Sequence, residues 1–134
     1  MTHAFRTLAL VLSTIALGAF APSASAVWPD PFTGPWEATD LDGSRMVLAF
    51  AGADDVRAVL LADDRATGCG EPHAPAAAAG LGVVDADDPH VLHVVYHVVC
   101  AVGPTYLNSP AAFTYRPASD TLVDGWGLVW HRPA

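Results

Sequence analysis

Three histidines near the middle of the chain, His90, His93 and His97, have the residue type and spacing that first indicate metal chemistry. On a helix, His93 and His97 would lie one turn apart on the same face, as zinc sites require. The Val, Leu and Tyr residues around them favour a strand, where the two rings share a face but stand about 13 Å apart at about 3.3 Å per residue. A zinc site would then need ligands from neighbouring strands, so we expect a solvated strand face and no metal or other cofactor.

Closely spaced carboxylates are the second candidate for chemistry. The segment Asp40-Leu-Asp42-Gly43-Ser44 begins like a calcium loop, but the later oxygen ligands and the distal Glu of an EF-hand do not follow. An Asp-Gly pair between two apolar runs is a hairpin signal, so we expect a tight turn at residues 41–44. Three more Asp pairs are expected in solvated turns at strand ends: Asp54-Asp55, Asp63-Asp64 and Asp87-Asp88.

Signatures of catalysis are few. The sequence has no Gly-x-Ser-x-Gly elbow, and Ser44, Ser109 and Ser119 lie in expected turns without a neighbouring His. A pair of carboxylates for glycoside hydrolysis can be drawn from any of the 14 Asp and Glu residues, so their abundance identifies no particular pair. We therefore assign no catalytic residue.

Three aromatic side chains are candidate binding residues: Trp126, Trp28 and Tyr96. Trp126 stands between two glycines in an expected turn, where an exposed indole would anchor a sugar, lipid or protein contact. Alternatively, it folds back to plug the barrel end beside Trp36 or Trp130. Trp28 precedes the domain and is a second possible exposed anchor, and Tyr96 lies in the strongest predicted strand.

The N-terminus predicts export. His3 and Arg6 precede an apolar run at residues 8–20, and Ala24-Ser25-Ala26 is typical of a signal-peptidase site, so residues 1–26 read as a signal peptide. The apolar run is shorter than the roughly 20 residues of a membrane-spanning helix. We expect a secreted, extracellular protein with no membrane segment after signal removal.

The charge of the chain excludes one class of partner. It has 14 acidic and six basic residues, for a formal charge of −8, and no Lys. Because Arg6 leaves with the signal segment, the mature chain carries about −9. Such a surface repels phosphate backbones, so nucleic acid is not an expected partner.

Cys69 and Cys100 are the only cysteines. An even count in a small exported domain argues for a disulfide, although two buried free thiols are the alternative. The two cysteines are 31 residues apart, and a disulfide that closes a loop of that length stabilises a domain by about 3–4 kcal/mol.

The pattern of the mature chain predicts an all-β fold. Residues 27–35 should be an extended lead-in, and residues 36–134 a single domain. Residues 65–80 read as a long loop anchored by Cys69, with a short helix at 76–79 as the alternative. Strands are expected at 36–40, 46–51, 56–62, 81–84, 91–101, 112–116, 121–123 and 128–131, with 56–62 also compatible with a helix. About seven or eight short strands form an antiparallel meander, for which we prefer a closed or partly closed barrel over a β-sandwich.

Residues 91–101 carry the clearest alternation. Leu92, Val94, Tyr96, Val98 and Cys100 share one face by the two-residue period of a strand. That face should belong to the core, and the opposite face should be half exposed.

The segment Gly34-Pro-Trp36-Glu-Ala38-Thr-Asp40-Leu-Asp42-Gly43-Ser44 resembles the Gly-x-Trp opening of the first strand in lipocalins and avidin-like proteins. Across nearly the whole mature chain, the pattern more closely resembles small secreted bacterial domains of uncharacterised function. It adds these segments: Asp63-Asp64, Cys69-Gly70, Cys100, Phe113-Thr-Tyr115, Asp120-Thr-Leu122-Val-Asp124 and Gly127-Leu-Val-Trp130-His-Arg132. The bacterial resemblance implies an exported β-domain with one disulfide and brings no activity.

The lipocalin resemblance implies a barrel in which an early Trp closes one end and an Arg near the C-terminus packs on it. Trp36 and Arg132 fit those two places. The chain is shorter than a typical lipocalin and lacks its other motifs, so the resemblance does not imply a roomy cavity.

These observations favour a secreted, non-enzymatic binding or interaction module whose loops or open end contact a small apolar molecule or an extracellular protein. A small extracellular hydrolase using acidic residues at a barrel mouth is the first alternative, and a structural surface or matrix component is the second. An apolar pocket would favour binding, whereas two converging carboxylates, one with a raised pKa, would favour hydrolysis.

Overall fold

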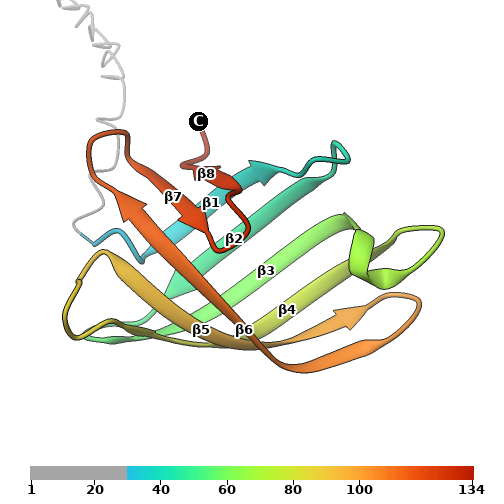
Figure 1. Ribbon diagram of the computed structural model, residues 1–134, viewed down its shortest axis with the longest axis horizontal. Coiled ribbons are helices and arrows are strands. Elements are labelled where there is room, and N and C mark those ends of the chain that lie inside the picture. Colours follow the sequence, from blue (N-terminus) through green and yellow to red (C-terminus); the bar gives the residue numbers. More distant parts are fainter. Residues whose placement is uncertain (1–29) are drawn as a thin grey trace, which may run out of the picture.

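The computed structural model describes residues 30–134 and is an eight-stranded antiparallel barrel (Figure 1). The strands are β1 (Gly34–Thr39), β2 (Arg45–Ala51), β3 (Val56–Ala66), β4 (Ala74–Val84), β5 (Val91–Cys100), β6 (Thr105–Arg116), β7 (Thr121–Asp124) and β8 (Val129–His131). One short 3₁₀ helix, η1 (Thr67–Cys69), precedes β4. The predicted signal peptide at residues 1–26 and Trp28 lie outside the described residues. No helix within residues 30–134 is long and apolar enough to cross a membrane.

The strands pair in chain order, and the barrel closes through the pairing of Glu37 in β1 with His131 in β8. The preferred barrel is thus confirmed. The β1–β2 connection is the expected hairpin turn, in which the N–H of Gly43 donates to the carbonyl of Asp40 and the N–H of Asp40 to the carbonyl of Ser44.

The predicted long loop at residues 65–80 is wrong, and so is its helical alternative. β3 continues to Ala66, and β4 begins at Ala74 and runs for 11 residues. The alanines of β4 alternate between buried and exposed positions and pair with β3 on one side and β5 on the other. Two paired neighbours override the helix propensity of alanine, because a strand between them satisfies all of its backbone hydrogen bonds.

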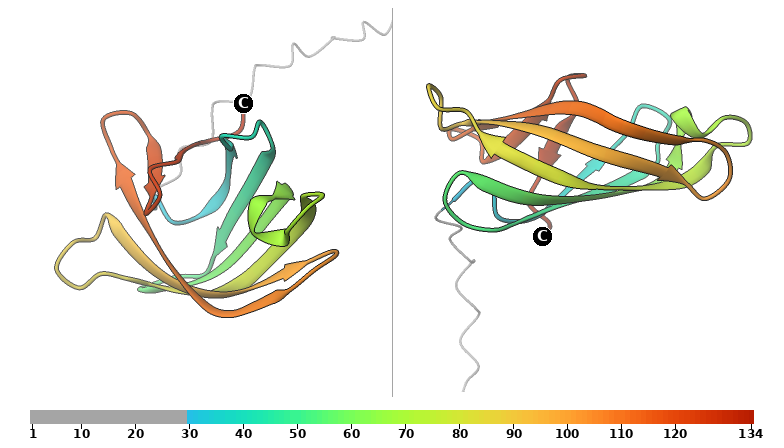
Figure 2. Two further views of the ribbon diagram at one scale, coloured as in Figure 1. Left: turned by 45° about the vertical axis from the view of Figure 1, so that its right-hand side comes forward. Right: turned by 90° about the horizontal axis from the view of Figure 1, so that it is seen from below.

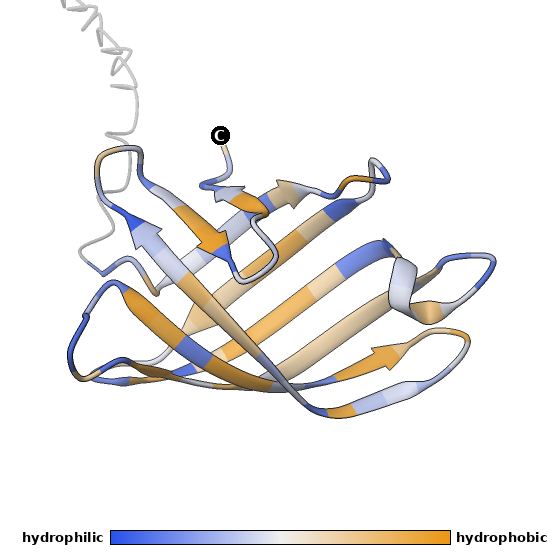
Figure 3. Ribbon diagram, viewed as in Figure 1, coloured by the Kyte–Doolittle hydropathy of each residue, from blue (hydrophilic) through white to orange (hydrophobic). Residues whose placement is uncertain are grey.

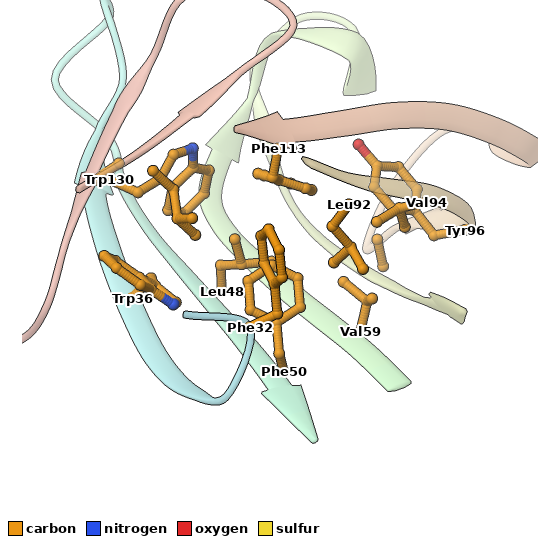
Figure 4. Packing of buried hydrophobic residues seen from close by; sticks show 13 residues of the cluster. Phe32, Trp36, Leu48, Phe50, Val59, Leu92, Val94, Tyr96, Phe113 and Trp130 are labelled. Atoms are coloured by element: carbon orange, nitrogen blue, oxygen red, sulfur yellow. The ribbon is translucent and has the colours of Figure 1, made fainter. Parts of the chain in front are cut away.

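The alternation predicted for β5 is confirmed. Leu92, Val94, Tyr96 and Cys100 are buried and Val98 is partly buried, whereas the residues between them are mostly exposed. The inward residues join a core rich in aromatic rings, including Phe50, Phe113 and Trp130 (Figure 4).

One end of the barrel, which we call the closed end, is sealed by the chain before and after the strands. Phe32, in the segment expected to be a simple lead-in, is buried in the core. The guanidinium of Arg57 donates hydrogen bonds to the carbonyls of Phe32, Asp54 and Val56 and pairs with Asp30.

Trp36 and Arg132 complete the closed end. The guanidinium carbon of Arg132 lies 3.8 Å from the centroid of the Trp36 ring, and the side chain donates to the carbonyls of Thr33 and Pro31. The two residues therefore make the contact that the lipocalin resemblance implied.

The opposite end, the open end, is uneven because the strands differ in length. β3–β6 have 10 to 12 residues, whereas β7 has four and β8 has three. Consequently β6 pairs with β7 only from Phe113 onward, and β3–β6 extend past β7 and β8 (Figure 2).

The predicted disulfide is confirmed and lies at the open end. Cys69 and Cys100 are bonded with their Cα atoms 5.5 Å apart, and both are buried with Ala74 and Ala76. The bridge ties η1 to the end of β5, and the hydroxyl of Tyr106 in β6 donates to the carbonyl of Gly68. The rim of the open end is therefore held covalently and by a hydrogen bond.

Candidate functional site

A cavity of about 690 Å³ opens at the open end of the barrel. Its size falls within the range of 300–1,000 Å³ that is usual for small-molecule sites. Most of its wall is apolar, and the lining comes from all the long strands, from η1 and from the β7–β8 turn. The apolar lining includes Met46, Leu61, Ala76, Ala78, Val98 and Phe113.

The space exists because β4 places small side chains on the inner face of the barrel. Ala76 and Ala78 are buried and line the cavity, opposite the larger residues of β8 and the β7–β8 turn. A strand face built from alanine leaves a volume that leucine or valine would occupy. The alanine-rich sequence, which was mistaken for a loop, thus helps to leave the barrel hollow at this end.

Aromatic rings surround the cavity. Trp130 and Phe113 lie at its inner wall with ring centroids 6.2 Å apart, and Tyr106 and Trp126 lie at its mouth. Trp126 is 74% exposed, so it does not plug the barrel beside Trp36 or Trp130. It keeps a cavity-lining position with most of its ring in solvent.

Asp124 positions Trp126. Its Oδ1 accepts hydrogen bonds from the N–H groups of Trp126 at 3.0 Å and Leu128 at 2.9 Å, and its Oδ2 accepts one from Nε1 of Trp130 at 3.2 Å. The sequence predicted a turn at Trp126 but gave Asp124 no role in it. The Asp-Gly-Trp-Gly string was the signal available, because an Asp before glycines often binds backbone N–H groups two residues on.

Tyr96 is the sequence-predicted residue that the structure places inside the cavity. Its side chain is 7% exposed, and no described residue hydrogen-bonds to its hydroxyl. Figure 4 shows the hydroxyl turned away from Val59 and Leu92. Burial, and secondarily the negative charge of Asp124, raise the pKa of Tyr96, so the phenol stays neutral and can both donate and accept a hydrogen bond.

Two further carboxylates line the cavity. Asp63 is 7% exposed, and its Oδ1 accepts the N–H of Arg65 at 3.0 Å. Asp40, near the mouth, accepts the N–H of Leu41. No lining residue in the described chain is Lys, Arg or His, and no three metal-binding side chains within residues 30–134 are grouped to hold an ion.

The histidines lie elsewhere. His93 and His97 are exposed on the outer face of β5, as the alternation predicted, and His97 Nδ1 accepts the N–H of Asn108. His93 Nε2 lies 2.9 Å from Oδ2 of Asp85. The structure therefore gathers Trp126 and Tyr96 at one cavity and leaves the histidines outside it.

Comparison of the chain with protein-family models, with curated proteins and with solved structures finds no match.

Proposed function

We propose that this protein is a secreted, non-enzymatic binding protein that holds a small, largely apolar molecule inside the open end of its barrel. The observation that carries the proposal is the cavity of about 690 Å³ with an apolar wall and a few polar groups. Small-molecule sites generally have that composition, in which the apolar area supplies affinity and the polar groups fix orientation.

The rim supports retention of a ligand. Trp126 is a large, amphipathic ring held at the mouth by a turn that Asp124 organises. The Cys69–Cys100 disulfide fixes η1 on the opposite side of the same mouth. A mouth ordered in advance costs less entropy when a ligand binds.

The signal segment and the disulfide both support an extracellular site of action, because disulfides persist in oxidising compartments. Asp124 gives hydrolysis no comparable support, since both of its oxygens accept hydrogen bonds from the β7–β8 turn and Trp130.

Filling the cavity tests the proposal. In Ala78→Phe, the added ring would occupy the hollow beside Leu61 and Val98, so we expect the affinity for Nile red, an uncharged fluorescent dye, to fall by at least about tenfold. Dye fluorescence titrated against the mature protein, residues 27–134, measures the affinity.

The matched control is Ala118→Phe, which adds the same ring to an exposed turn between β6 and β7 at the closed end. Its dye affinity should equal that of the wild type. Equal affinities in all three proteins, with Ala78→Phe still folded by circular dichroism, would show that the dye does not use the cavity and would count against the proposal.

A further inference from the structure

The charges around the cavity are all of one sign. Asp40, Asp63 and Asp124 line it, without any Lys, Arg or His among the lining residues of the described chain. Asp124 already accepts three hydrogen bonds. Asp40 and Asp63 each accept one hydrogen bond from a described residue, and of the two only Asp63 is buried. A buried carboxylate in an apolar wall is costly unless a positive or hydrogen-bonding group meets it.

Tyr96 points to a ligand independently. It is more than nine-tenths buried, lines the same cavity and offers a hydroxyl that no described residue binds. The hydroxyl is open to the cavity, where a polar group of an entering molecule can reach it.

We propose that the ligand of this site is an organic cation with an apolar, preferably aromatic body. Its protonated amine contacts Asp63, and the Tyr96 hydroxyl borders the bound molecule. The inference rests on the proposed binding function and specifies the class of ligand. A bare metal ion does not fit, since no three carboxylates or other ligating side chains of residues 30–134 are grouped around one point. A carboxylate ligand such as a fatty acid would bring a fourth negative charge among the three.

The aromatic rings of the cavity suit the same ligand. Trp126 and Tyr106 lie at the mouth of the cavity. The faces of their rings attract an ammonium group that enters the cavity or rests beside the rings. The chain's formal charge of −8 also draws cations and repels anions at long range.

A set of three ligands with one ring system and different charge tests the class. The probes are 1-naphthylmethylamine, which is cationic at pH 7, 1-naphthylmethanol, which is neutral, and 1-naphthoic acid, which is anionic. We expect the amine to bind at least about tenfold more tightly than the alcohol, and the acid to bind most weakly, by calorimetric titration. Equal affinities of amine and alcohol would overturn the cation inference and leave the binding function standing. Failure of all three to bind would overturn both.

Asp63→Asn identifies the contact, because it removes the charge and keeps an oxygen for the N–H of Arg65. We expect the preference for amine over alcohol to fall about tenfold in this variant, with the alcohol's affinity unchanged. The matched control is Asp64→Asn, which makes the same change at an exposed neighbour and should keep the preference. An unchanged preference in Asp63→Asn would show that Asp63 does not meet the amine.

A second inference concerns the outside of the barrel and rests on different residues. β3, β4 and β5 are largely apolar along their central parts (Figure 3). The outward positions of residues 56–62, 77–83 and 91–99 carry Val, Leu, Ala and two His, with no Asp, Glu, Lys or Arg. Six of these side chains are at least half exposed: Val56, Leu60, Leu81, Val83, Val95 and Val99. We call this surface the outer apolar face.

The relief and extent of the outer apolar face fit a second copy of the same chain. Ala62, Ala77 and Ala79 line a shallow hollow of about 470 Å³ that lies between Leu60 and Val99. Leu81 follows Ala79 on the same outward side of β4. With strands about 4.8 Å apart and about 3.3 Å per residue, this face together with the neighbouring Val47 and Ala49 of β2 covers roughly 500 Å² in projection. Two such faces together would bury roughly 1,000 Å², the size of a weak, transient interface.

We infer that two copies pair through this face, with Leu81 of each copy in the alanine hollow of the other. A twofold arrangement of this kind uses the same patch twice. It also suits a chain of charge −8, because the face itself carries no carboxylate to be brought against its own image.

Sedimentation equilibrium of the mature protein tests the pairing. We expect a dimer at micromolar concentrations, and at least a tenfold weaker dimer in Leu81→Glu, because the new carboxylate would be buried in an apolar contact. The control is Leu41→Glu, which makes the same change at a fully exposed residue of the β1–β2 turn and should leave the dimer intact. A monomeric wild type at 100 µM would overturn the inference, and co-sedimentation of that monomer with phosphatidylcholine vesicles would assign the face to a lipid surface instead.

Discussion

Replacing Arg57 with Met is expected to lower the free energy of unfolding by about 3–5 kcal/mol, a large part of the stability of a small domain. Arg57 is 3% exposed and is the polar centre of the closed end. It donates to the carbonyls of Phe32, Asp54 and Val56 and pairs with Asp30. Methionine keeps most of the side-chain volume but leaves these acceptors without their donor, and an unsatisfied buried acceptor costs more than the bond itself contributes.

The loss should be visible as a lower midpoint of urea unfolding, followed by tryptophan fluorescence. Arg45→Met is the matched control, since Arg45 is an exposed residue whose salt bridge with Glu37 lies in solvent. Exposed pairs contribute up to about 1 kcal/mol, so this variant should unfold near the wild-type midpoint. Similar midpoints for the two Arg variants would mean that Arg57 does not hold the closed end.

The residues that the sequence analysis placed correctly are those whose local pattern and tertiary environment agree. In β5, large β-branched and aromatic side chains alternate strictly, so the buried face containing Leu92, Val94 and Tyr96 follows from the two-residue period alone. The Asp-Gly turn after Asp40 is a similarly local signal. The pairing of Cys69 with Cys100 follows from there being only two cysteines in the chain.

The prediction of a loop at residues 65–80 was wrong because the local sequence and the tertiary environment disagree there. Alanine favours helix in isolation and has the same hydropathy at every position, so Ala76–Ala79 shows no alternation that could reveal a strand. Their strand conformation comes from pairing with Leu61 and Val98 on either side, and neither contact is visible in the local sequence.

The candidate site was only half predictable. Trp126 was identified because a large aromatic between glycines is unusual, and its exposure decided against the plug. Asp63 was assigned to a solvated turn because an Asp pair ordinarily ends a strand. It is buried instead, because β3 continues past it and turns its side chain into the barrel. A cavity depends on how much volume facing residues leave, and that requires knowing which residues face each other.

Gly80→Ala is expected to destabilise the barrel by about 3 kcal/mol or more, although it adds a single methyl group. A Cβ on Gly80 would lie 2.1 Å from the carbonyl oxygen of Val95 and 2.5 Å from the Cα of Tyr96. Both atoms belong to the backbone of β5, the strand that pairs with β4 at this point, so no side-chain rotation relieves the clash. Glycine in a strand commonly marks such a close approach of two backbones.

The melting temperature measures the effect, and we expect a decrease of more than about 10 °C for this size of domain. Gly125→Ala is the matched control, because no atom lies within 4 Å of the position of its Cβ. This control should melt at or slightly above the wild-type temperature, since alanine also reduces the entropy of the unfolded chain. Because Tyr96 pairs with Gly80 and supplies the cavity hydroxyl, any folded Gly80→Ala protein should also bind amines less tightly. Equal melting temperatures for the two variants would mean that β4 and β5 separate at Gly80 without cost, which would contradict the prediction.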